Sequence, residues 1–398
     1  MARERTTRSP VTARVPRASA LPAAPRLKGS GAGLAPCGFD LLVLTVANDV
    51  QRRYAEQMLD IRKTLGTLPH GLETLVIADS AGKRIGSGGS TLLCMAELAK
   101  RGMLKNARAP VNGHRILILH SGGDSRRLPS WSAPGKIWVP LGRTGRAKSV
   151  RGKPNATATR GTAPIETPAH GLGPFNVPTL FDLILAELSR LTLPTSGGVL
   201  VASGDAALRL ADEHITFATG GATVLAFPGG PDRAARHGVF VLDKRNRVVS
   251  TLQKPSRVQL QSAGALSASG HAAIDSGIFF FPTAACHALL RGAGAEPRTG
   301  RAPAGSLLAE LTRGNASLDL YQEIAHAMSS SAERATFVTR FAAGGSIARE
   351  RMLGTFFTAT HHVALHATLL KKGEFPAPWH YARTHRTTFV NHAGAHVS

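Results

Sequence analysis

Cysteine and long apolar runs are both scarce in this sequence of 398 residues. The three cysteines, Cys37, Cys94 and Cys286, are widely spaced and form no C-x-x-C pair, which argues against a disulfide framework and against a zinc site. No uninterrupted apolar run reaches the ~18 residues that a membrane-spanning helix needs. We therefore expect a protein of a reducing compartment, in the cytoplasm, without a membrane partner.

Acidic and aromatic residues are also few. The chain holds 48 Lys and Arg against 25 Asp and Glu, a formal net charge of +23. Much of this surplus lies in two stretches without apolar periodicity, which predicts a disordered basic tail over residues 1–36 and a basic loop insertion over residues 142–165. Aromatic residues make up 5% of the chain and none lies in these basic runs, which argues against a nucleic-acid partner. An anionic substrate is compatible with the same charge.

Short apolar runs alternate with helical patterns through the first half of the chain. The predicted strands cover residues 39–46, 72–78, 116–119 and 198–202, and the predicted helices cover residues 49–65, 92–101 and 176–191. This alternation predicts an α/β fold with a mixed, mostly parallel sheet and helices on both faces. Strands dominate between residues 221 and 282, which predicts an antiparallel edge or a small β subdomain. We assign one domain to residues 37–345 and treat residues 346–398 as an incomplete or poorly defined C-terminal segment.

The stretch from Ile116 to Pro140 carries the clearest chemical signal. A buried strand ends at His120, and Gly122 and Gly123 follow it, so backbone N–H groups can approach a ligand closely there. Arg126, Arg127, Gly135 and Lys136 come next, and guanidinium and ammonium groups are suited to binding phosphates. The stretch is not a P-loop, because Ile137 stands where that motif requires Ser or Thr, and it contains no G-x-G-x-x-G.

A second glycine-rich segment precedes this stretch. Gly86, Gly88, Gly89 and Ser90 lie in the sequence GSGGST, directly before a helix predicted from Leu92. A glycine turn at a helix N-terminus is a favourable anion site, because unpaired N–H groups and the positive end of the helix dipole meet there. The alternative is a flexible connector, since Gly and Ser alone are a weak signal.

Asp205 and Lys254 follow two other predicted strands. Asp205 ends the run Gly198–Asp205, and a carboxylate at the carboxyl end of a strand lies where α/β sheets bind ligands. Mg²⁺ is held by one or two carboxylates together with water and phosphate oxygens, so Asp205 is a candidate magnesium ligand, with a helix N-cap as the alternative. Lys254 precedes Pro255, which predicts an extended backbone at the lysine.

The string GGDSRRLPSWSAPGKIWVPL, with LQKPS further on, resembles the fucose-1-phosphate guanylyltransferase (GDP-fucose pyrophosphorylase) family. The same domain forms one half of bifunctional fucokinase/guanylyltransferase enzymes. The resemblance implies a Rossmann-like nucleotidyltransferase fold and a reaction that joins GTP and a sugar-1-phosphate, with fucose-1-phosphate expected, and releases pyrophosphate with Mg²⁺ as cofactor.

The resemblance also implies roles for individual residues. Arg127, Lys136 and Lys254 are the expected catalytic cations, Asp205 and Asp319 the expected metal ligands, Asp275 and Gly277 the expected neighbours of the sugar phosphate, and Gly86, Gly88, Gly89, Ser90, Gly122, Gly123, Arg126 and Gly135 the expected nucleotide-binding residues. Three other functions stay open: a nucleotidyltransferase with another nucleotide or sugar, a sugar kinase, and a catalytically inactive remnant that binds a sugar nucleotide.

Overall fold

The structure is a computed structural model that describes residues 37–104, 113–121, 131, 133–140, 178–205, 210, 215–218, 220–329 and 347–370. The predicted basic tail and basic loop insertion therefore lie outside the described residues. The three cysteines of the chain are described, and each has a free thiol. None of the helices in the described ranges has the length and apolar character needed to cross a bilayer.

Strands and helices alternate along the first part of the described chain, as the periodicity predicts. The principal elements are β1 (Leu41–Val46), α1 (Asp49–Thr64), β2 (Glu73–Ala78), α2 (Gly86–Lys100), β3 (Arg115–His120), η3 (Lys136–Trp138), α3 (Leu180–Leu188), β4 (Gly198–Ser203), β5 (Gly221–Gly229), α4 (Pro231–Ala234), β6 (Gly238–Leu242), β7 (Val248–Gln253), α5 (Arg257–Ser262), β8 (Ala272–Phe281), α6 (Thr283–Gly292), α7 (Leu307–Thr312), η5 (Leu320–Ile324), α8 (Ala325–Ala327), α10 (Ile347–Thr360) and β9 (Ala364–Leu369).

The strands form one mixed sheet, which the described residues build from nine strands in the order β2-β1-β3-β4-β8-β5-β9, with β6 and β7 attached beside β8. The first four are mutually parallel, and β8 is antiparallel to both β4 and β5. Since β9 is parallel to β5, and β6 pairs antiparallel with both β7 and β8, only β7 and β8 oppose the common direction. The predicted α/β class and mostly parallel sheet are confirmed.

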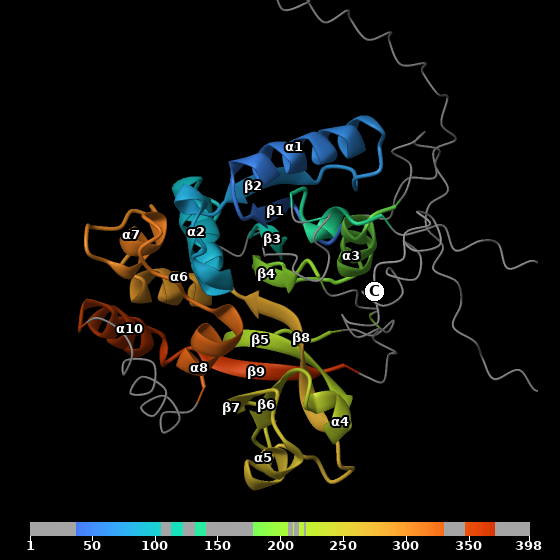
Figure 1. The fold of residues 1–398 in the computed structure, drawn as a ribbon, viewed down its shortest axis with the longest axis vertical. Coiled ribbons are helices and arrows are strands. Elements are labelled where there is room, and N and C mark those ends of the chain that lie inside the picture. The colour runs from blue at the N-terminus through green and yellow to red at the C-terminus, as the bar shows by residue number, and fades with distance from the viewer. Residues whose placement is uncertain are drawn as a thin grey trace, which may run out of the picture. The chain divides into compact units, whose positions relative to one another are not determined.

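Each face of the sheet carries its own apolar core. Alternate residues of β3 point to opposite sides, with Ile116 and Ile118 in one core and Leu117 and Leu119 in the other. Helices α1 and α3 cover one face, and α2, α6, α7 and α10 cover the other (Figure 1). Because both faces are covered, the middles of β1, β3 and β4 are apolar and buried, and the polar residues Thr45, His120 and Ser203 lie toward their carboxyl ends.

Helix α2 begins earlier than the glycine pattern predicts. The sequence predicts a turn over residues 86–91 and a helix from Leu92, whereas the helix starts at Gly86. Gly86 has φ +77°, and a Cβ there would lie 2.3 Å from the carbonyl oxygen of Leu318. The N–H of Gly89 donates to that same oxygen at 3.0 Å. The prediction of a turn was wrong because glycine here permits close packing of a helix, which outweighs its low helix propensity.

The sheet continues beyond residue 345, the domain boundary that the sequence predicts. Helix α10 packs in the same core as α6, through buried residues that include Leu353 and Phe356. Strand β9 then pairs in parallel with β5, from Gly221 opposite Ala364 to Ala226 opposite Leu369. Residues 347–370 are therefore part of the same α/β unit, although neither α10 nor β9 was predicted from the sequence.

Candidate active site

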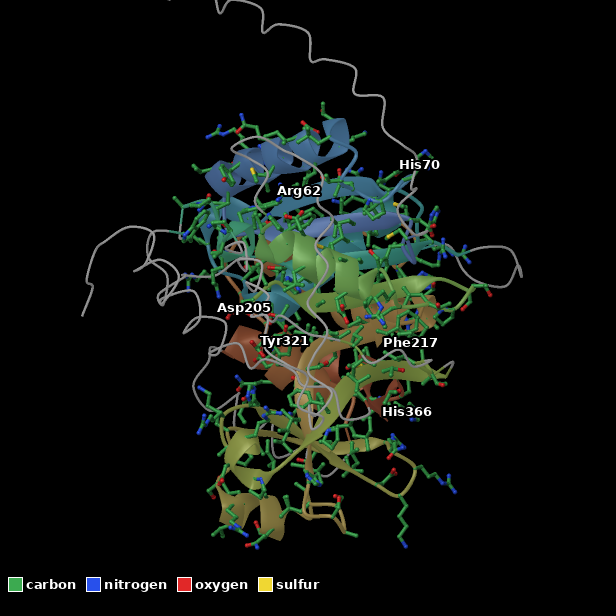
Figure 2. All side chains as sticks on the ribbon, turned by 90° about the vertical axis from the view of Figure 1, so that its right-hand side faces the viewer. Arg62, His70, Asp205, Phe217, Tyr321 and His366 are labelled. Carbon is green, nitrogen blue, oxygen red and sulfur yellow. The ribbon has the colours of Figure 1, made fainter. Side chains whose placement is uncertain are left out.

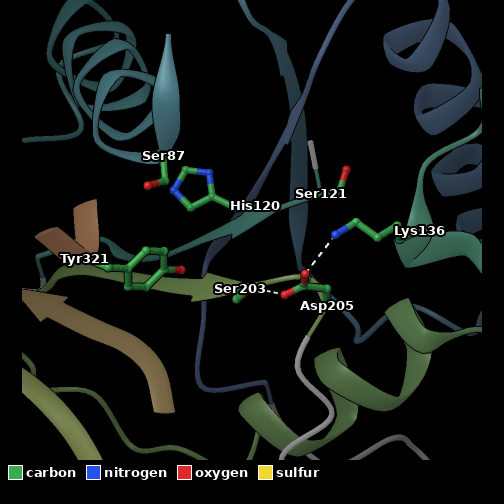
Figure 3. Close-up of a pocket in the computed structure, with 8 residues that line it drawn as sticks. Ser87, His120, Ser121, Lys136, Ser203, Asp205 and Tyr321 are labelled. Atoms are coloured by element: carbon green, nitrogen blue, oxygen red, sulfur yellow. Dashed lines mark hydrogen bonds and ion pairs between the residues drawn. The ribbon is translucent and has the colours of Figure 1, made fainter. Parts of the chain in front are cut away.

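A small polar cavity lies at the carboxyl ends of β3 and β4 (Figure 3). Its volume is about 140 Å³, which is room for a phosphate-sized group and well below the ~300–1,000 Å³ of pockets that enclose a whole small molecule. Eight residues line it, namely Ser87, His120, Ser121, Lys136, Ser203, Gly204, Asp205 and Tyr321. Binding sites of open α/β sheets are expected at this edge, where neighbouring strands end together.

Lys136 and Asp205 face one another across the cavity. Lys136 Nζ lies 2.8 Å from Asp205 Oδ2, and Ser203 Oγ donates to Asp205 Oδ1 at 2.5 Å. The Asp205 side chain is 50% exposed and that of Lys136 is 26% exposed, so this ion pair is open to solvent. Exposed ion pairs contribute little to stability, commonly 0–1 kcal/mol. The pair is therefore better placed to bind a ligand than to hold the fold together.

The position of Lys136 is fixed by the two residues that follow it. Ile137 and Trp138 are fully buried, and Trp138 packs against Phe181 of α3 with ring centroids 4.9 Å apart. The guanidinium of Arg62, on α1, lies 5.0 Å from the centroid of the Trp138 ring. Arg62 also pairs with Asp182 at 2.7 Å. This buried arginine therefore joins α1, η3 and α3, and Lys136 extends into the cavity from the anchored end of η3.

The end of β1 fixes the end of β3. The carbonyl oxygen of Thr45 accepts hydrogen bonds from the backbone N–H of Ser121 at 3.0 Å and from its hydroxyl at 2.9 Å. The backbone N–H of Gly204 donates to the carbonyl oxygen of His120 at 2.7 Å. Strands β1, β3 and β4 are thus tied together one residue beyond their ladders, and Ser121, directly before the Gly122-Gly123 pair, is held firmly.

The opposite wall comes from η5, whose N-cap is Asp319. The carboxylate of Asp319 accepts from the backbone N–H of Gln322 at 2.8 Å and from the hydroxyl of Ser87 at 3.3 Å. The backbone N–H of Asp319 donates to Glu323 at 2.7 Å, and that of Leu320 donates to Ser87 Oγ at 2.9 Å. These bonds dock the start of η5 onto the start of α2, so that Tyr321 points into the cavity.

A bulge in β8 places the carboxyl group of Asp275 near Tyr321. The register of β8 against β5 shifts between Ile278 and Asp275, and Gly277 in this bulge faces Ser203 and Tyr321. Loss of hydration raises the pKa of Asp275 to about 7, and the nearby charge of Asp319 adds to the rise. Burial raises the pKa of the Tyr321 phenol, and Asp275, Asp205 and Asp319 raise it further. Tyr321 is therefore a permanent hydroxyl donor among three carboxyl groups.

The oxygen-rich wall fits a magnesium ion in chemical type. The described residues contain no cluster of three or more His, Cys, Asp or Glu that could enclose a metal ion. Magnesium in nucleotide enzymes needs only one or two carboxylates, because phosphate oxygens and water complete its octahedron. Asp205 in the cavity wall and Asp319 beside the cavity supply hard oxygen donors, and the charges of both raise the pKa of the Tyr321 phenol. Figure 2 shows Asp205 and Tyr321 close together, with His366 of β9 well away from them.

Comparison with known proteins places this site in a family. A family model described as the fucose pyrophosphorylase domain matches residues 110–376. The chain belongs to the fucose pyrophosphorylase domain family. The match includes the strand ends and η3 that carry Ser121, Lys136 and Asp205, and it extends through β9.

The relatives of this fucose pyrophosphorylase domain are much longer proteins. A "Bifunctional fucokinase/GDP-fucose pyrophosphorylase" of Arabidopsis thaliana is 29% identical over 268 residues, which is 60% of this chain and 23% of that protein. A human "Fucose-1-phosphate guanylyltransferase" is 32% identical over 209 residues, which is 52% of this chain and 28% of that protein. A "L-fucokinase/L-fucose-1-P guanylyltransferase" of Bacteroides fragilis is 29% identical over 220 residues. The chain thus spans about a quarter of the length of the curated relatives it matches.

The structure brings some of the predicted residues of this fucose pyrophosphorylase domain together and leaves others unobserved. Lys136 and Asp205 line one cavity, and Asp275, Gly277 and Asp319 surround Tyr321 beside it. Gly135 directly precedes η3, near the carbonyl oxygen of Ser121. Four predicted phosphate-binding residues lie outside the described residues, namely Gly122, Gly123, Arg126 and Arg127.

The glycine segment of α2 has a packing function that was not predicted. Gly88 and Gly89 are buried, and Cβ atoms on them would press on Asp319, Ile324 and Leu311. Ser90 is also buried, and its hydroxyl donates to Asp79 Oδ1 at 2.5 Å. Burial raises the pKa of Asp79 to about 6. Within this segment the side chain that reaches the cavity is that of Ser87, so the nucleotide-binding roles of Gly86, Gly88, Gly89 and Ser90 stay predictions.

Lys254 departs from its predicted backbone conformation. The residue before a proline favours an extended backbone, but Lys254 has φ +46°, in the left-handed region. The chain turns here from β7 into α5, which starts at the N-cap Ser256, and the backbone N–H of Lys254 donates to the carbonyl oxygen of His237 at 2.9 Å. This turn outweighs the local preference, so the prediction was wrong. The Lys254 side chain is exposed.

Sequence reasoning missed most of the residues that line the cavity. Ser87, His120, Ser121, Ser203 and Tyr321 were not assigned roles. Two of them had a usable signal, because His120 and Ser203 directly end buried strands beside residues that were assigned. Tyr321 and Ser87 had none, since they meet through contacts between segments more than 200 positions apart in the chain.

Proposed function

We propose that this chain is a sugar-1-phosphate guanylyltransferase that forms GDP-fucose, or a closely similar nucleotide-sugar, and pyrophosphate. An oxygen of the sugar-1-phosphate forms a bond to the α-phosphorus of GTP, and the bond from that phosphorus to the bridging oxygen breaks. The electron pair of the broken bond leaves with pyrophosphate. The observation that carries the proposal is the solvent-open pair of Lys136 and Asp205 at the strand ends, inside the region matched by the fucose pyrophosphorylase model.

The protein's contribution to this reaction is orientation and charge neutralisation, because no covalent intermediate is needed. Lys136 is held at its stem by buried η3 residues, so its ammonium group can turn from Asp205 to the phosphate oxygens of the leaving pyrophosphate. Ser121, whose hydroxyl and N–H both donate to the carbonyl oxygen of Thr45, is a fixed neighbour of Lys136 in the cavity wall. Arg127, with help from Arg126, would supply further positive charge, and Gly122 and Gly123 would supply N–H donors.

Asp205 and Asp319 would hold Mg²⁺ together with phosphate oxygens of the nucleotide. When bound, the ion would neutralise charge on the α- and β-phosphates. The sugar phosphate would lie toward β8, where Asp275 and Gln253 both lie against Gly238 and Lys254 follows. Carboxyl and amide groups are suited to sugar hydroxyls, and Tyr321 offers a phenolic donor between the two halves of the site.

The test is incubation of the chain with GTP, Mg²⁺ and fucose-1-phosphate, with release of pyrophosphate followed over time. We expect release that depends on all three components and that Asp205→Asn reduces by at least about 100-fold. UTP, ATP, and mannose- and glucose-1-phosphates in parallel arms identify the nucleotide and sugar. Absence of pyrophosphate in every arm would refute the proposal, and ADP formed from ATP and fucose without pyrophosphate would indicate a kinase instead.

The setting of this reaction is part of the same proposal. Free thiols at Cys37, Cys94 and Cys286 are compatible with a reducing cytoplasm. GTP and a sugar-1-phosphate are anions, and a chain with a formal charge of +23 attracts anions without any need for a nucleic-acid or membrane partner.

A further inference from the structure

His120 is the one imidazole in the wall of the cavity, and the function proposed above gives it no task. Both of its ring nitrogens are engaged by threonine hydroxyls that are themselves buried. Thr45 Oγ1, from β1, lies 2.8 Å from Nδ1, and Thr91 Oγ1, from α2, lies 2.9 Å from Nε2. Thr45 is 3% exposed and Thr91 is 0% exposed, so water does not compete for these contacts.

The direction of these hydrogen bonds follows from the bonds around them. The hydroxyl of Thr91 lies 2.8 Å from the carbonyl oxygen of Ser87, which can only accept, so the single proton of Thr91 is used there. Thr91 must then accept from His120, which puts a proton on Nε2. Nδ1 of the neutral ring is left as an acceptor for the hydroxyl of Thr45. Loss of hydration lowers the pKa of His120 to about 4, in keeping with a neutral ring.

The contacts of the ring continue through Ser87 to Asp319, beside the cavity. Thr91 donates to the backbone carbonyl oxygen of Ser87. The side-chain hydroxyl of the same Ser87 accepts from the N–H of Leu320 at 2.9 Å and donates to Asp319 Oδ2 at 3.3 Å. Figure 3 shows His120 and Ser87 side by side, with Tyr321 on the same side of the cavity. One imidazole thus connects the ends of β1 and β3 to the first turn of α2 and the N-cap of η5.

We propose that His120 is a positioning residue that sets the distance between the phosphate-facing strand ends and Asp319. The proposal rests on the guanylyltransferase function, since it assigns Asp319 to the magnesium side of the site. It predicts that the Nε2–H donor to Thr91 matters more than the Nδ1 acceptor for Thr45, because only the Nε2 branch leads to Ser87 and Asp319. Ser87 bonds Asp319 directly, and groups that bond a metal ligand directly typically change metal affinity or activity by ~10–100-fold. His120 would act on this contact through Thr91 and Ser87.

Two substitutions separate the two branches. In His120→Gln the amide nitrogen is as many bonds from Cβ as Nε2 and can still donate to Thr91. In His120→Asn the amide oxygen corresponds to Nδ1, so the contact with Thr45 is kept and the one with Thr91 is lost. Thr91→Val removes the hydroxyl with little change of shape and should resemble His120→Asn, whereas Thr45→Val should not.

The measurements are the Mg²⁺ concentration for half-maximal pyrophosphate release, KM and kcat, and the Mg²⁺ dependence of GTP binding by calorimetry. Each assay gives a Mg²⁺ midpoint, the concentration for half-maximal pyrophosphate release or half-maximal GTP binding. We expect His120→Asn and Thr91→Val to raise both midpoints about 10-fold, with kcat at saturating Mg²⁺ within about threefold of the parent. His120→Gln should stay within about threefold in both assays. Nitrogen-15 NMR of the parent should show the proton on Nε2.

Several outcomes would overturn the proposal. The proposal fails if NMR finds the proton on Nδ1, or if His120→Asn leaves the Mg²⁺ midpoints unchanged. It also fails if His120→Gln and His120→Asn have equal effects, which would indicate a purely structural imidazole. The parent could bind GTP in a Mg²⁺-dependent way, with the expected shifts of the Mg²⁺ midpoint in His120→Asn and Thr91→Val, and yet release no pyrophosphate. That result would refute the proposed function and support the positioning role. A parent that does not bind Mg²⁺ and GTP would refute both.

Discussion

The two carboxylates assigned to the metal, Asp205 in the cavity wall and Asp319 beside the cavity, are held in opposite ways. Asp205, at the end of β4, is 50% exposed and contacts its sequence neighbour Ser203 and the solvent-open Lys136. Asp319 is instead the N-cap of η5, and its carboxylate and backbone hold hydrogen bonds to Gln322, Ser87 and Glu323. The bonds of Asp205 to Lys136 and Ser203 are made between side chains, whereas Asp319 cannot turn away without breaking the junction of α2 and η5.

The difference is between an ion pair open to solvent, Lys136 with Asp205, and the packed junction of α2 with η5. A site that binds a charged substrate needs groups whose counter-ions can be replaced, and it also needs a frame that stays in place while this happens. The pair of Lys136 and Asp205 meets the first need, and the packed junction of Gly86 with Leu318 meets the second. Substitutions of Lys136 or Asp205 should therefore change activity with little loss of stability, and substitution of the packed glycine in the junction, Gly86, should mainly lower stability.

The largest effect is expected for Lys136→Ala. Loss of a cation that neutralises the leaving pyrophosphate should lower kcat for pyrophosphate release by roughly 100- to 1,000-fold, with the melting temperature almost unchanged because the ion pair is exposed. Lys100→Ala is the matched control, since that lysine is 55% exposed on α2 in a surface pair with Glu97, and it should leave kcat within about twofold. Activity of Lys136→Ala within a few-fold of the parent would remove this residue from the proposed role.

The packed junction of α2 with η5 is tested by Gly86→Ala. The new Cβ would lie 2.3 Å from the carbonyl oxygen of Leu318, and the alanine would have to adopt φ +77°. We therefore expect the free energy of unfolding, measured in urea, to be about 2–4 kcal/mol lower than that of the parent. Gly66→Ala is the control, because Gly66 has φ +65° but nothing within 4 Å of a Cβ, so it reports backbone strain alone, about 1–2 kcal/mol. Equal losses for the two variants would show that the contact with Leu318 contributes nothing.

The same contrast explains what the sequence could and could not predict. Strand ends are predictable because apolar runs define the strands and parallel register then brings their last residues together, which is how Asp205 was found. Lys136 was found instead from the Gly135-Lys136 pair that follows the Gly122-Gly123 turn and from the family resemblance. The junction of α2 with η5 depends on contacts such as Ser87 to Asp319, 232 positions apart, for which neither segment carries a periodic signal. Glycine was informative in both regions but ambiguous, since it serves ligand approach and helix packing through the same missing Cβ.

A pair of substitutions at Asp319 sharpens the comparison between charge and capping. Asparagine is as good an N-cap as aspartate, so Asp319→Asn should keep the stability of the junction and lose only the charge, whereas Asp319→Ala should also lose about 1 kcal/mol of unfolding free energy. Both should raise the Mg²⁺ concentration for half-maximal activity about 10-fold. If Asp319→Asn requires no more Mg²⁺ than the parent, Asp319 is a structural cap and Asp205 carries the metal alone.

The smallest effect concerns Asp275, at the bulge of β8 beside the cavity. Its pKa is raised from 3.8 to about 7 by loss of hydration, so the folded state holds the proton more tightly than the unfolded chain. The stability that this group contributes is then fully present below about pH 4 and is lost as the pH rises through about 7. Asp275→Asn removes that dependence, so in urea unfolding the stability of the variant relative to the parent should increase from about pH 4 to about pH 7 and then level off. Other titrating groups cancel in this difference.

A difference that stays constant with pH would mean that Asp275 is as well hydrated as an ordinary surface carboxylate. The group of carboxyls around Tyr321 would then be open to solvent on the β8 side as well as on the Asp205 side.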